Sequence, residues 1–370
     1  MGTLPLDLFG IFYQQVLKRI LFTQDPGWVH ERMSASGEQL GSIGAGNILK
    51  PIFGTDDPRL SQKICGIEFN SPIGLAAGFD YNAQLTQILF GLGFGFQSIG
   101  TITNLAYEGN VKPMLGRLPK SRSLMVNKGF KNYGAQIISE KLQNLDFKIP
   151  LGISIGRSNS LVLKTQKESV RDIITSFKIV QEHTIKNSYY ELNISCPNLK
   201  GDISFYPPKN LHELLTEIDH LKLTKPVFIK MPIELNDKEL LSLVEVIIKH
   251  SPKGIIIGNL QKNRNDPVLL SEEVKKFSVG NFSGKATWTR SNELIALVHK
   301  RYKKDLVIIG CGGVFSAEDA YLKLQLGSSL VQLITGMIFQ GPQLISQINH
   351  GLLNKLDRTG EQSIKDIVRS

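Results

Sequence analysis

Eight strand-like stretches, separated by segments long enough to hold a helix, constrain the fold of this chain more than any other feature. Each stretch is rich in valine, isoleucine and small residues, and the segments between them carry helical patterns. The stretches lie at residues 71–79, 96–103, 150–156, 189–195, 226–232, 254–259, 306–312 and 329–335. Continuously apolar strands that alternate with helices are typical of a parallel sheet with covered faces. Eight such units predict an α/β fold, a closed (β/α)8 TIM barrel.

An open, doubly wound sheet is the alternative, but such a sheet would not naturally stop at eight evenly built units. About seventy residues before the barrel do not fit the repeat. We expect a helix in this part, a loop rich in Gly and Ser at 34–46, and a short strand at 64–69 that plugs the bottom of the barrel. The predicted domains are a small N-terminal helical module at 1–45 and the barrel at 46–370.

The N-terminal segment has apolar residues near helical spacing. They include Leu8, Ile11, Val16 and Ile20, with Lys18 beside them. Such a helix either docks on the protein or lies in a membrane interface. No apolar run approaches the ~20 residues that a membrane span needs, and we expect no signal peptide because the start of the chain carries no basic region.

Composition narrows the class of protein further. The formal charge of +10 permits contact with phosphorylated cofactors, anionic lipid or nucleic acid. The basic residues are dispersed, however, except for a cluster at 299–304 that we expect at the exposed C-terminal end of a helix. Nucleic-acid binding is therefore not favoured. Three distant cysteines form neither a disulfide framework nor a metal site, which favours a reducing compartment.

The run Glu-Leu-Asn-Ile-Ser-Cys-Pro-Asn at 191–198 places reactive groups at the end of a strand. Pro197 cannot donate to a sheet ladder, so the strand should end near Cys196. Asn193 and Asn198 add two amides beside the thiol. Parallel α/β enzymes build their sites at this end of their strands. The alternative is an ordinary loop with a buried thiol, which is common for cysteine.

Other strand ends extend this site. Lys230 is an amine at the tip of an apolar strand, and an unpaired buried charge is costly, so it needs a negative partner. Gly312 and Gly313 follow the seventh strand, and Thr335 and Gly336 follow the eighth, where barrels often bind phosphate on backbone amides. A phosphate site, a lysine and an amide-lined pocket together predict bound flavin mononucleotide (FMN), with the lysine facing the N1–O2 edge of the ring.

The sequence resembles the dihydroorotate dehydrogenase family over residues 15–345. The resemblance rests on the motifs Gly-Leu-Ala-Ala-Gly-Phe-Asp at 74–80, Gly-Phe-Lys-Asn at 129–132, Asn-Ile-Ser-Cys-Pro-Asn at 193–198, Ile-Gly-Cys-Gly-Gly at 309–313 and Phe-Gln-Gly-Pro at 339–342. The run Leu-Phe-Thr-Gln-Asp-Pro at 21–26, with His30, is similar to the quinone-using, membrane-associated class, which carries an extra helical N-terminus.

The resemblance implies a site residue by residue. The residues that it implies for FMN binding are Ala77, Gly78, Thr101, Asn193, Lys230, Gly284, Gly313 and Thr335. The backbone of Gly312 and Gly336, from the predicted phosphate site, is added to this set. Its orotate amides fall on Asn193, Asn198 and Asn259, and its catalytic base falls on Cys196. It further implies a quinone as partner and a cytoplasmic protein on the inner face of the cell membrane, and it leaves a homodimer open.

Several positions depart from the family pattern. The quinone-using class usually has serine as its base, whereas this chain has Cys196. The lysine that normally follows the motif at 74–80 is Tyr81, and an expected asparagine is Val126. The two threonines that flank Asn259 in the family are Gly258 and Leu260 here. Lys128 precedes Gly129 and Phe130, a loop that covers orotate in the family. We therefore expect Lys128 to supply the missing cation, the alternative being a solvated loop charge.

The implied activity is the oxidation of dihydroorotate to orotate in pyrimidine biosynthesis, with electrons passed to a quinone. A soluble acceptor, such as fumarate or NAD reached through a partner subunit, is the alternative that Cys196 suggests. A tRNA-dihydrouridine synthase is another, but that enzyme adds a helical domain after the barrel, and only about thirty residues follow Phe339. A barrel that binds without catalysis is disfavoured because Cys196, Lys230 and the asparagines are present.

Overall fold

The computed structural model describes residues 4–303 and 305–369 and contains a closed barrel of eight parallel strands. The strands follow one another around the barrel in chain order, and the last pairs with the first. They are β3 (Ile73–Leu75), β4 (Phe96–Ile102), β7 (Leu151–Ile155), β8 (Tyr189–Asn193), β9 (Val227–Met231), β10 (Gly254–Ile257), β12 (Val307–Cys311) and β13 (Leu330–Leu333). The predicted TIM barrel and all eight predicted strands are confirmed.

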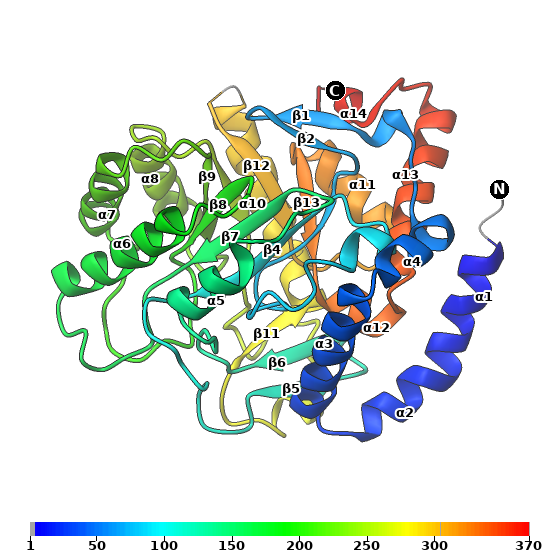
Figure 1. The fold of residues 1–370 in the computed structure, drawn as a ribbon, viewed down its shortest axis with the longest axis horizontal. Coiled ribbons are helices and arrows are strands. Elements are labelled where there is room, and N and C mark those ends of the chain that lie inside the picture. Colours follow the sequence, from blue (N-terminus) through cyan, green and yellow to red (C-terminus); the bar gives the residue numbers. More distant parts are fainter. Residues whose placement is uncertain (1–3, 304, 370) are drawn as a thin grey trace.

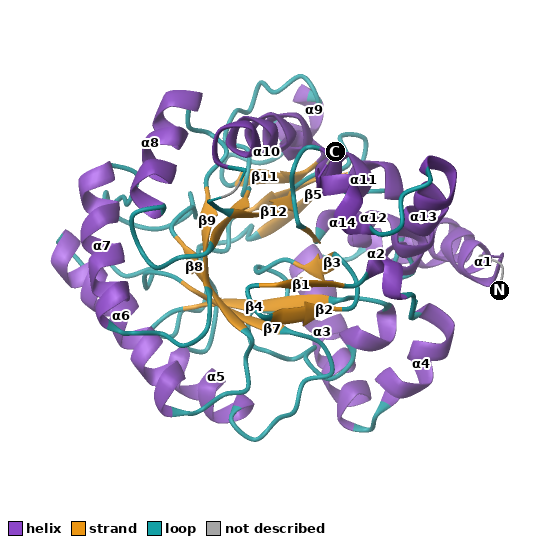
Figure 2. Cartoon of the chain, turned by 90° about the horizontal axis from the view of Figure 1, so that it is seen from above, coloured by secondary structure: helices purple, strands orange, loops and turns teal. Residues whose placement is uncertain are grey.

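Helices surround the strands when the barrel is seen from above (Figure 2). The longer ones are α5 (Ala135–Leu142), α6 (Gln166–Glu182), α7 (Pro208–His220), α8 (Asp237–Ile247), α10 (Trp288–Tyr302), α11 (Ala317–Gln325) and α13 (Leu344–Thr359). Short helices are α9 (Ser271–Val274), α12 (Thr335–Gln340) and α14 (Ile364–Arg369). The basic cluster ends α10 as expected, apart from residue 304, which lies outside the described residues. Capping boxes begin α6 and α8 and fix where these helices start.

The first strand is not followed by an α-helix, contrary to the expected repeat. The segment after β3 forms only a 3-10 helix, η3 (Leu89–Leu92), against which α4 (Ala45–Phe53) packs. Gly46 and Gly91 permit this contact, because a Cβ at position 91 would overlap the backbone of Gly46. An N-terminal helix thus takes part in the outer layer of the barrel.

The predicted Gly- and Ser-rich loop at 34–46 is wrong. Its residues continue α3 (Pro26–Ser42), which begins at the N-cap Asp25, and then start α4. The small residues serve packing rather than a turn. A Cβ at Gly37 would overlap Leu85, and one at Gly41, a helical turn later, would lie 3.1 Å from Gln87. Small residues on one face let α3 lie close to the loop after β3.

The predicted N-terminal helix forms as α1 (Leu4–Phe12), a π-helical turn η1 (Tyr13–Leu17) and α2 (Lys18–Thr23) in one continuous stretch. One side of it docks on the barrel: the Tyr13 hydroxyl donates to the Ile338 carbonyl at 2.8 Å, and Lys18 donates to the Phe339 carbonyl at 3.3 Å. Figure 1 shows this stretch running along α12 and α13, at the side of the molecule.

Two small sheets lie outside the barrel wall (Figure 1). Instead of the single strand expected at 64–69, the antiparallel hairpin β1 (Gln62–Ile64) and β2 (Ile67–Phe69) turns at Cys65 and Gly66, which both have positive φ. Its Phe69 packs on Phe96 inside the barrel, so the predicted plug is present. The second sheet, formed by β5 (Leu115–Leu118), β6 (Ser123–Val126) and β11 (Asn281–Gly284), lies at the opposite end, near the carboxyl ends of the barrel strands.

Candidate active site

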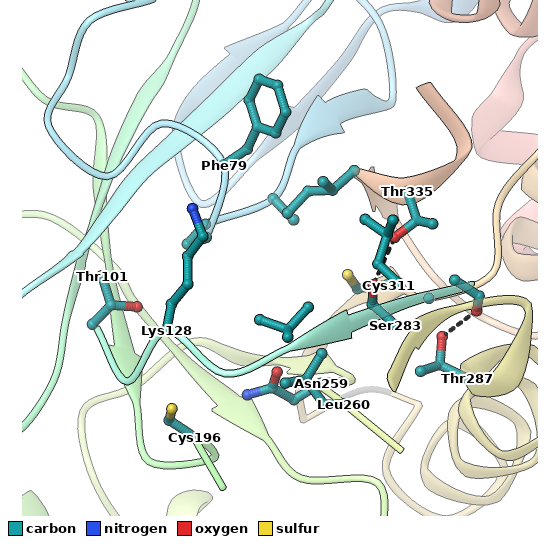
Figure 3. A pocket seen from close by; sticks show the side chains of 18 of the residues that line it. Phe79, Thr101, Lys128, Cys196, Asn259, Leu260, Ser283, Thr287, Cys311 and Thr335 are labelled. Atoms are coloured by element: carbon teal, nitrogen blue, oxygen red, sulfur yellow. Dashed lines mark hydrogen bonds between the residues drawn. The ribbon is translucent and has the colours of Figure 1, made fainter. Parts of the chain in front are cut away.

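One large cavity opens at the carboxyl ends of the barrel strands (Figure 3). Its volume, including the open mouth, is about 1180 Å³. Every site residue predicted from the sequence lines it: Ala77, Gly78, Thr101, Lys128, Gly129, Phe130, Asn193, Cys196, Asn198, Lys230, Asn259, Gly284, Gly312, Gly313, Thr335 and Gly336. The closed barrel explains this convergence, because its βα loops all meet on one face.

Glycine backbone forms the wall on the side of β12 and β13. Gly312 and Gly313 have φ of 110° and 71°, values that other residues rarely adopt. A Cβ at Gly336 would overlap the Val314 carbonyl. Thr335 adds a hydroxyl, whose oxygen lies 2.8 Å from that of Ser283 on β11 (Figure 3). Backbone amides and hydroxyls without an acidic side chain suit a phosphate group.

Lys230 on β9 is 4 % exposed and contributes a cation to the cavity. Its ammonium donates to the Ala77 carbonyl at 3.4 Å, and the residue pairs in register with Asn193 on β8. The sequence predicted a negative partner, but no carboxylate of the described residues lies within ion-pair distance of it. A buried ammonium without an acid in the protein favours a ligand that carries negative charge.

Amide side chains form a connected network beside Lys230. Asn193 donates to the Thr101 hydroxyl at 2.8 Å and accepts from the Ser195 hydroxyl at 3.0 Å. Asn259 in turn donates to the Ser195 hydroxyl at 2.7 Å. Ser195 therefore fixes both asparagines, a role that the sequence reasoning missed although the residue lies inside the 193–198 motif. Side-chain amides carry donor and acceptor atoms together, which suits a planar heterocycle.

The remaining predicted amide, Asn198, is held from two sides. It donates to the Val126 carbonyl on β6 at 3.1 Å and accepts from Asn281 on β11 at 2.7 Å. The small sheet at the mouth thus positions a residue of the β8 loop. Reading only the barrel strand ends could not find Asn281, because β6 and β11 are far apart in the sequence.

Cys196 follows β8, with its thiol facing the cavity (Figure 3). Burial raises the pKa of the thiol to about 12, against the opposing effects of the Asn198 amide and of Lys230. A thiol can act as a base when its neighbours lower this pKa toward the working pH. Such neighbours are present, but burial outweighs them, so the thiol of the ligand-free protein is protonated at neutral pH.

The loop that carries Lys128 lies across the cavity from the glycine wall. Gly129 and Phe130 both have positive φ, and the Gly129 carbonyl accepts from the Asn159 side chain at 3.0 Å. The Lys128 ammonium donates a hydrogen bond to the Tyr81 hydroxyl, and this hydroxyl is hydrogen-bonded to His30 on α3. Both of these partners also line the cavity. The sequence marked Tyr81 as a departure and His30 as a class feature, but it gave no signal that they touch.

One other departure has a steric explanation. The threonine expected before Asn259 is Gly258, and a Cβ at this position would overlap Ile233. A threonine there would therefore require the Ile233 side chain to move.

The chain is similar to known proteins over most of its length. The sequence profile described as dihydroorotate dehydrogenase matches residues 59–356. A protein of Acaryochloris marina named dihydroorotate dehydrogenase (quinone) is 33% identical, the match covering 96% of this chain and 98% of that protein. One of the same name from Christiangramia forsetii is also 33% identical, over 93% of this chain and 99% of its own.

Solved structures give the same result. A crystal structure of DHODH from Eimeria tenella in complex with ferulenol superposes with a TM-score of 0.79 at 26% identity, covering 93% of this chain and 94% of its own. The profile match spans most of the chain, and the relatives cover nearly all of it. The chain therefore belongs to the dihydroorotate dehydrogenase family.

Proposed function

We propose that this protein oxidises dihydroorotate to orotate, uses bound FMN, and passes the electrons to a quinone. The observation that carries the proposal is the meeting of a thiol, a buried lysine, an amide network and a glycine wall in one cavity. Membership of the family and relatives that are named as quinone enzymes support it.

The residues present fit FMN. The glycine wall offers backbone and hydroxyl donors for the phosphate, and the Lys230 ammonium lacks an acidic partner among the described residues. Asn193 and Thr101 place polar groups beside Lys230. When bound, FMN supplies the acceptor for the two electrons that leave the substrate. The role of Lys230 is to offer positive charge to the flavin edge.

The purified protein is therefore expected to be yellow and to hold one FMN per chain. Replacing Lys230 with methionine removes a charge-assisted hydrogen bond, so FMN affinity should fall roughly 10- to 100-fold. Flavin released by denaturation gives the stoichiometry, and titration of the apoprotein gives the affinity. A colourless protein that takes up no flavin on reconstitution would end the cofactor proposal.

The amides bind the substrate, and the thiol carries out the proton transfer. Asn193, Asn198 and Asn259 hold the ring through its amide groups, and Phe130 closes over it from the loop. Cys196, as thiolate, takes the proton from C5 while a hydride leaves C6, which creates the C5–C6 double bond of orotate. Here cysteine does the work that serine usually does in the quinone-using class.

Lys128 is the cation that we assign to the substrate carboxylate. Replacing Lys128 with methionine should raise the KM for dihydroorotate roughly 10- to 100-fold, because a charge-assisted hydrogen bond is lost, with little change in kcat. Lys120→Met is the matched control, since Lys120 lies in the turn between β5 and β6, exposed and paired with Glu272. An unchanged KM in the Lys128 variant would make this lysine a solvated loop charge.

The N-terminal helices support the quinone and membrane part of the proposal. Of the 21 exposed large apolar residues described, 12 lie within residues 4–52. The helix of residues 4–23 both docks and exposes an apolar face, since Tyr13 contacts the barrel while Leu8, Ile11 and Ile20 are exposed. We infer that this face lies on the membrane surface and admits a quinone, and that residues 1–45 form the module concerned. No helix within the described residues is long and apolar enough to span a bilayer.

An acceptor panel tests the proposal. Orotate formation from dihydroorotate should be fast with a short-chain quinone and slow with fumarate or NAD⁺. Turnover with fumarate or NAD⁺ that equals quinone turnover would favour the soluble alternative. Binding of FMN without any orotate formation would reject the substrate.

A further inference from the structure

Three side chains from separate segments form one hydrogen-bonded chain at the edge of the cavity. The Lys128 ammonium donates to the Tyr81 hydroxyl, and that hydroxyl lies 2.8 Å from Nδ1 of His30 on α3. Nε2 of His30 lies 2.8 Å from the carbonyl of Phe79. The rings of His30 and Tyr81 are stacked, with centroids 4.9 Å apart and planes at 23°. The chain thus joins an N-terminal helix to the loop that would cover the substrate.

Each hydrogen bond that links Lys128, Tyr81, His30 and the Phe79 carbonyl has one possible direction. The Phe79 carbonyl can only accept, so Nε2 of His30 carries the hydrogen. Burial and the nearby Lys128 lower the pKa of His30 to about 3, so the ring is neutral near pH 7 and Nδ1 must accept. Tyr81 then donates its hydroxyl hydrogen to His30 and offers a lone pair to Lys128. Burial raises the pKa of Tyr81, which keeps the phenol protonated.

The Lys128 ammonium lies 4.2 Å from the centroid of the Tyr81 ring and lines the cavity. It has no carboxylate partner among the described residues. Glu31, the acid that raises its pKa, pairs instead with Lys131 at 2.7 Å. Tyr81 takes one of its three N–H groups. The other two can serve an anion in the cavity.

We propose that Tyr81 and His30 are positioning residues that hold the Lys128 ammonium where it binds the carboxylate of the substrate. The inference rests on the proposed function. Lys128 would supply the positive charge beside position 81, where the family's lysine is replaced by tyrosine. The lysine comes from another loop, and the tyrosine with its histidine support fixes that lysine in place.

The same arrangement predicts a pH dependence. The ionisable groups around Lys128 are His30 and Glu31 from α3, Tyr81 from the loop after β3, and Lys131 on its own loop. Burial and Lys131 lower the pKa of Lys128 to about 7, against the opposing effect of Glu31. Only the protonated amine attracts a carboxylate. Affinity for orotate should therefore be constant below pH 7 and fall up to tenfold per unit above it.

Orotate binding to the flavin-loaded protein tests the chain, measured by calorimetry across pH 5.5 to about 9, a window that brackets the lowered lysine pKa. Tyr81→Phe keeps the ring but removes the hydroxyl, and it should weaken orotate binding about 3- to 10-fold while kcat changes little. His30→Asn tests the second link and should have a smaller effect of the same kind. Tyr321→Phe is the matched control, because Tyr321 lies on α11 and does not line the cavity.

A rescue variant separates positioning from general damage. Tyr81→Lys combined with Lys128→Met returns an amine to position 81 and should recover much of the affinity that Lys128→Met loses. Wild-type affinity in Tyr81→Phe and His30→Asn would overturn the positioning role, as would an affinity that does not change between pH 6 and 9. If the wild-type protein binds FMN but neither orotate nor dihydroorotate, the proposed function itself fails, and this inference fails with it.

Discussion

Replacing Cys196 with alanine is expected to slow the reduction of the bound flavin by dihydroorotate about 10²- to 10⁴-fold, the usual contribution of a general base. FMN should stay bound, because the proposed flavin contacts are made by Lys230 and the glycine wall. Rapid mixing under anaerobic conditions measures the reduction step alone. Cys65→Ser is the matched control, since Cys65 is exposed in the β1–β2 turn at the far end of the barrel.

The pH profile makes this prediction sharper. The pKa of Cys196 is raised to about 12, so the thiolate fraction increases tenfold per pH unit throughout the neutral range. The reduction rate of the wild type should therefore rise with pH. Cys196→Ser should keep some activity, displaced to higher pH, because a hydroxyl is harder to deprotonate than a thiol. Reduction of the alanine variant at the wild-type rate would place the base elsewhere.

The second large effect is expected at the N-terminal helices. Leu8, Ile11 and Ile20 are 58%, 60% and 59% exposed on the helix of residues 4–23. Changing all three to glutamate should abolish binding to anionic liposomes and most turnover with a long-chain quinone, because both apolar insertion and attraction to anionic lipid are lost. Reduction of the flavin by dihydroorotate should be unchanged, since no proposed catalytic residue lies on this helix.

Substitution is a better test here than deletion of residues 1–45. His30, Gly37 and Gly41 pack α3 on the barrel, so deletion would uncover buried surface. Ile137→Glu is the control, because this residue is 55% exposed on α5, outside the N-terminal helices. Quinone turnover and liposome binding that survive the triple substitution would remove the membrane proposal.

The barrel and its strand ends could be predicted because they depend on local patterns. Each strand is a short buried run rich in apolar residues, and a closed parallel barrel brings residues such as Asn193 and Lys230 together without further information. The prediction of a loop at 34–46 was wrong for the opposite reason, because the structure there depends on contacts with a distant segment. Glycine usually marks a turn, but Gly37 and Gly41 allow close packing on a segment more than forty residues away in the sequence.

Contacts between segments far apart in the chain also could not be predicted from the sequence. The sheet of β5, β6 and β11 joins strands more than 150 residues apart, and it holds Asn198 through Asn281. Tyr81 and His30 are likewise 51 positions apart. The motifs identified the reactive groups, but the partners that orient those groups depend on tertiary packing.

Anaerobic titration of the purified flavoprotein tests the central claim most directly. One equivalent of dihydroorotate per flavin should bleach the visible flavin absorption and release orotate. Addition of a quinone should then restore the absorption, whereas fumarate and NAD⁺ should not. A flavin that dihydroorotate leaves oxidised would contradict the assigned reaction, and recovery with fumarate or NAD⁺ but not with quinone would contradict the assigned acceptor.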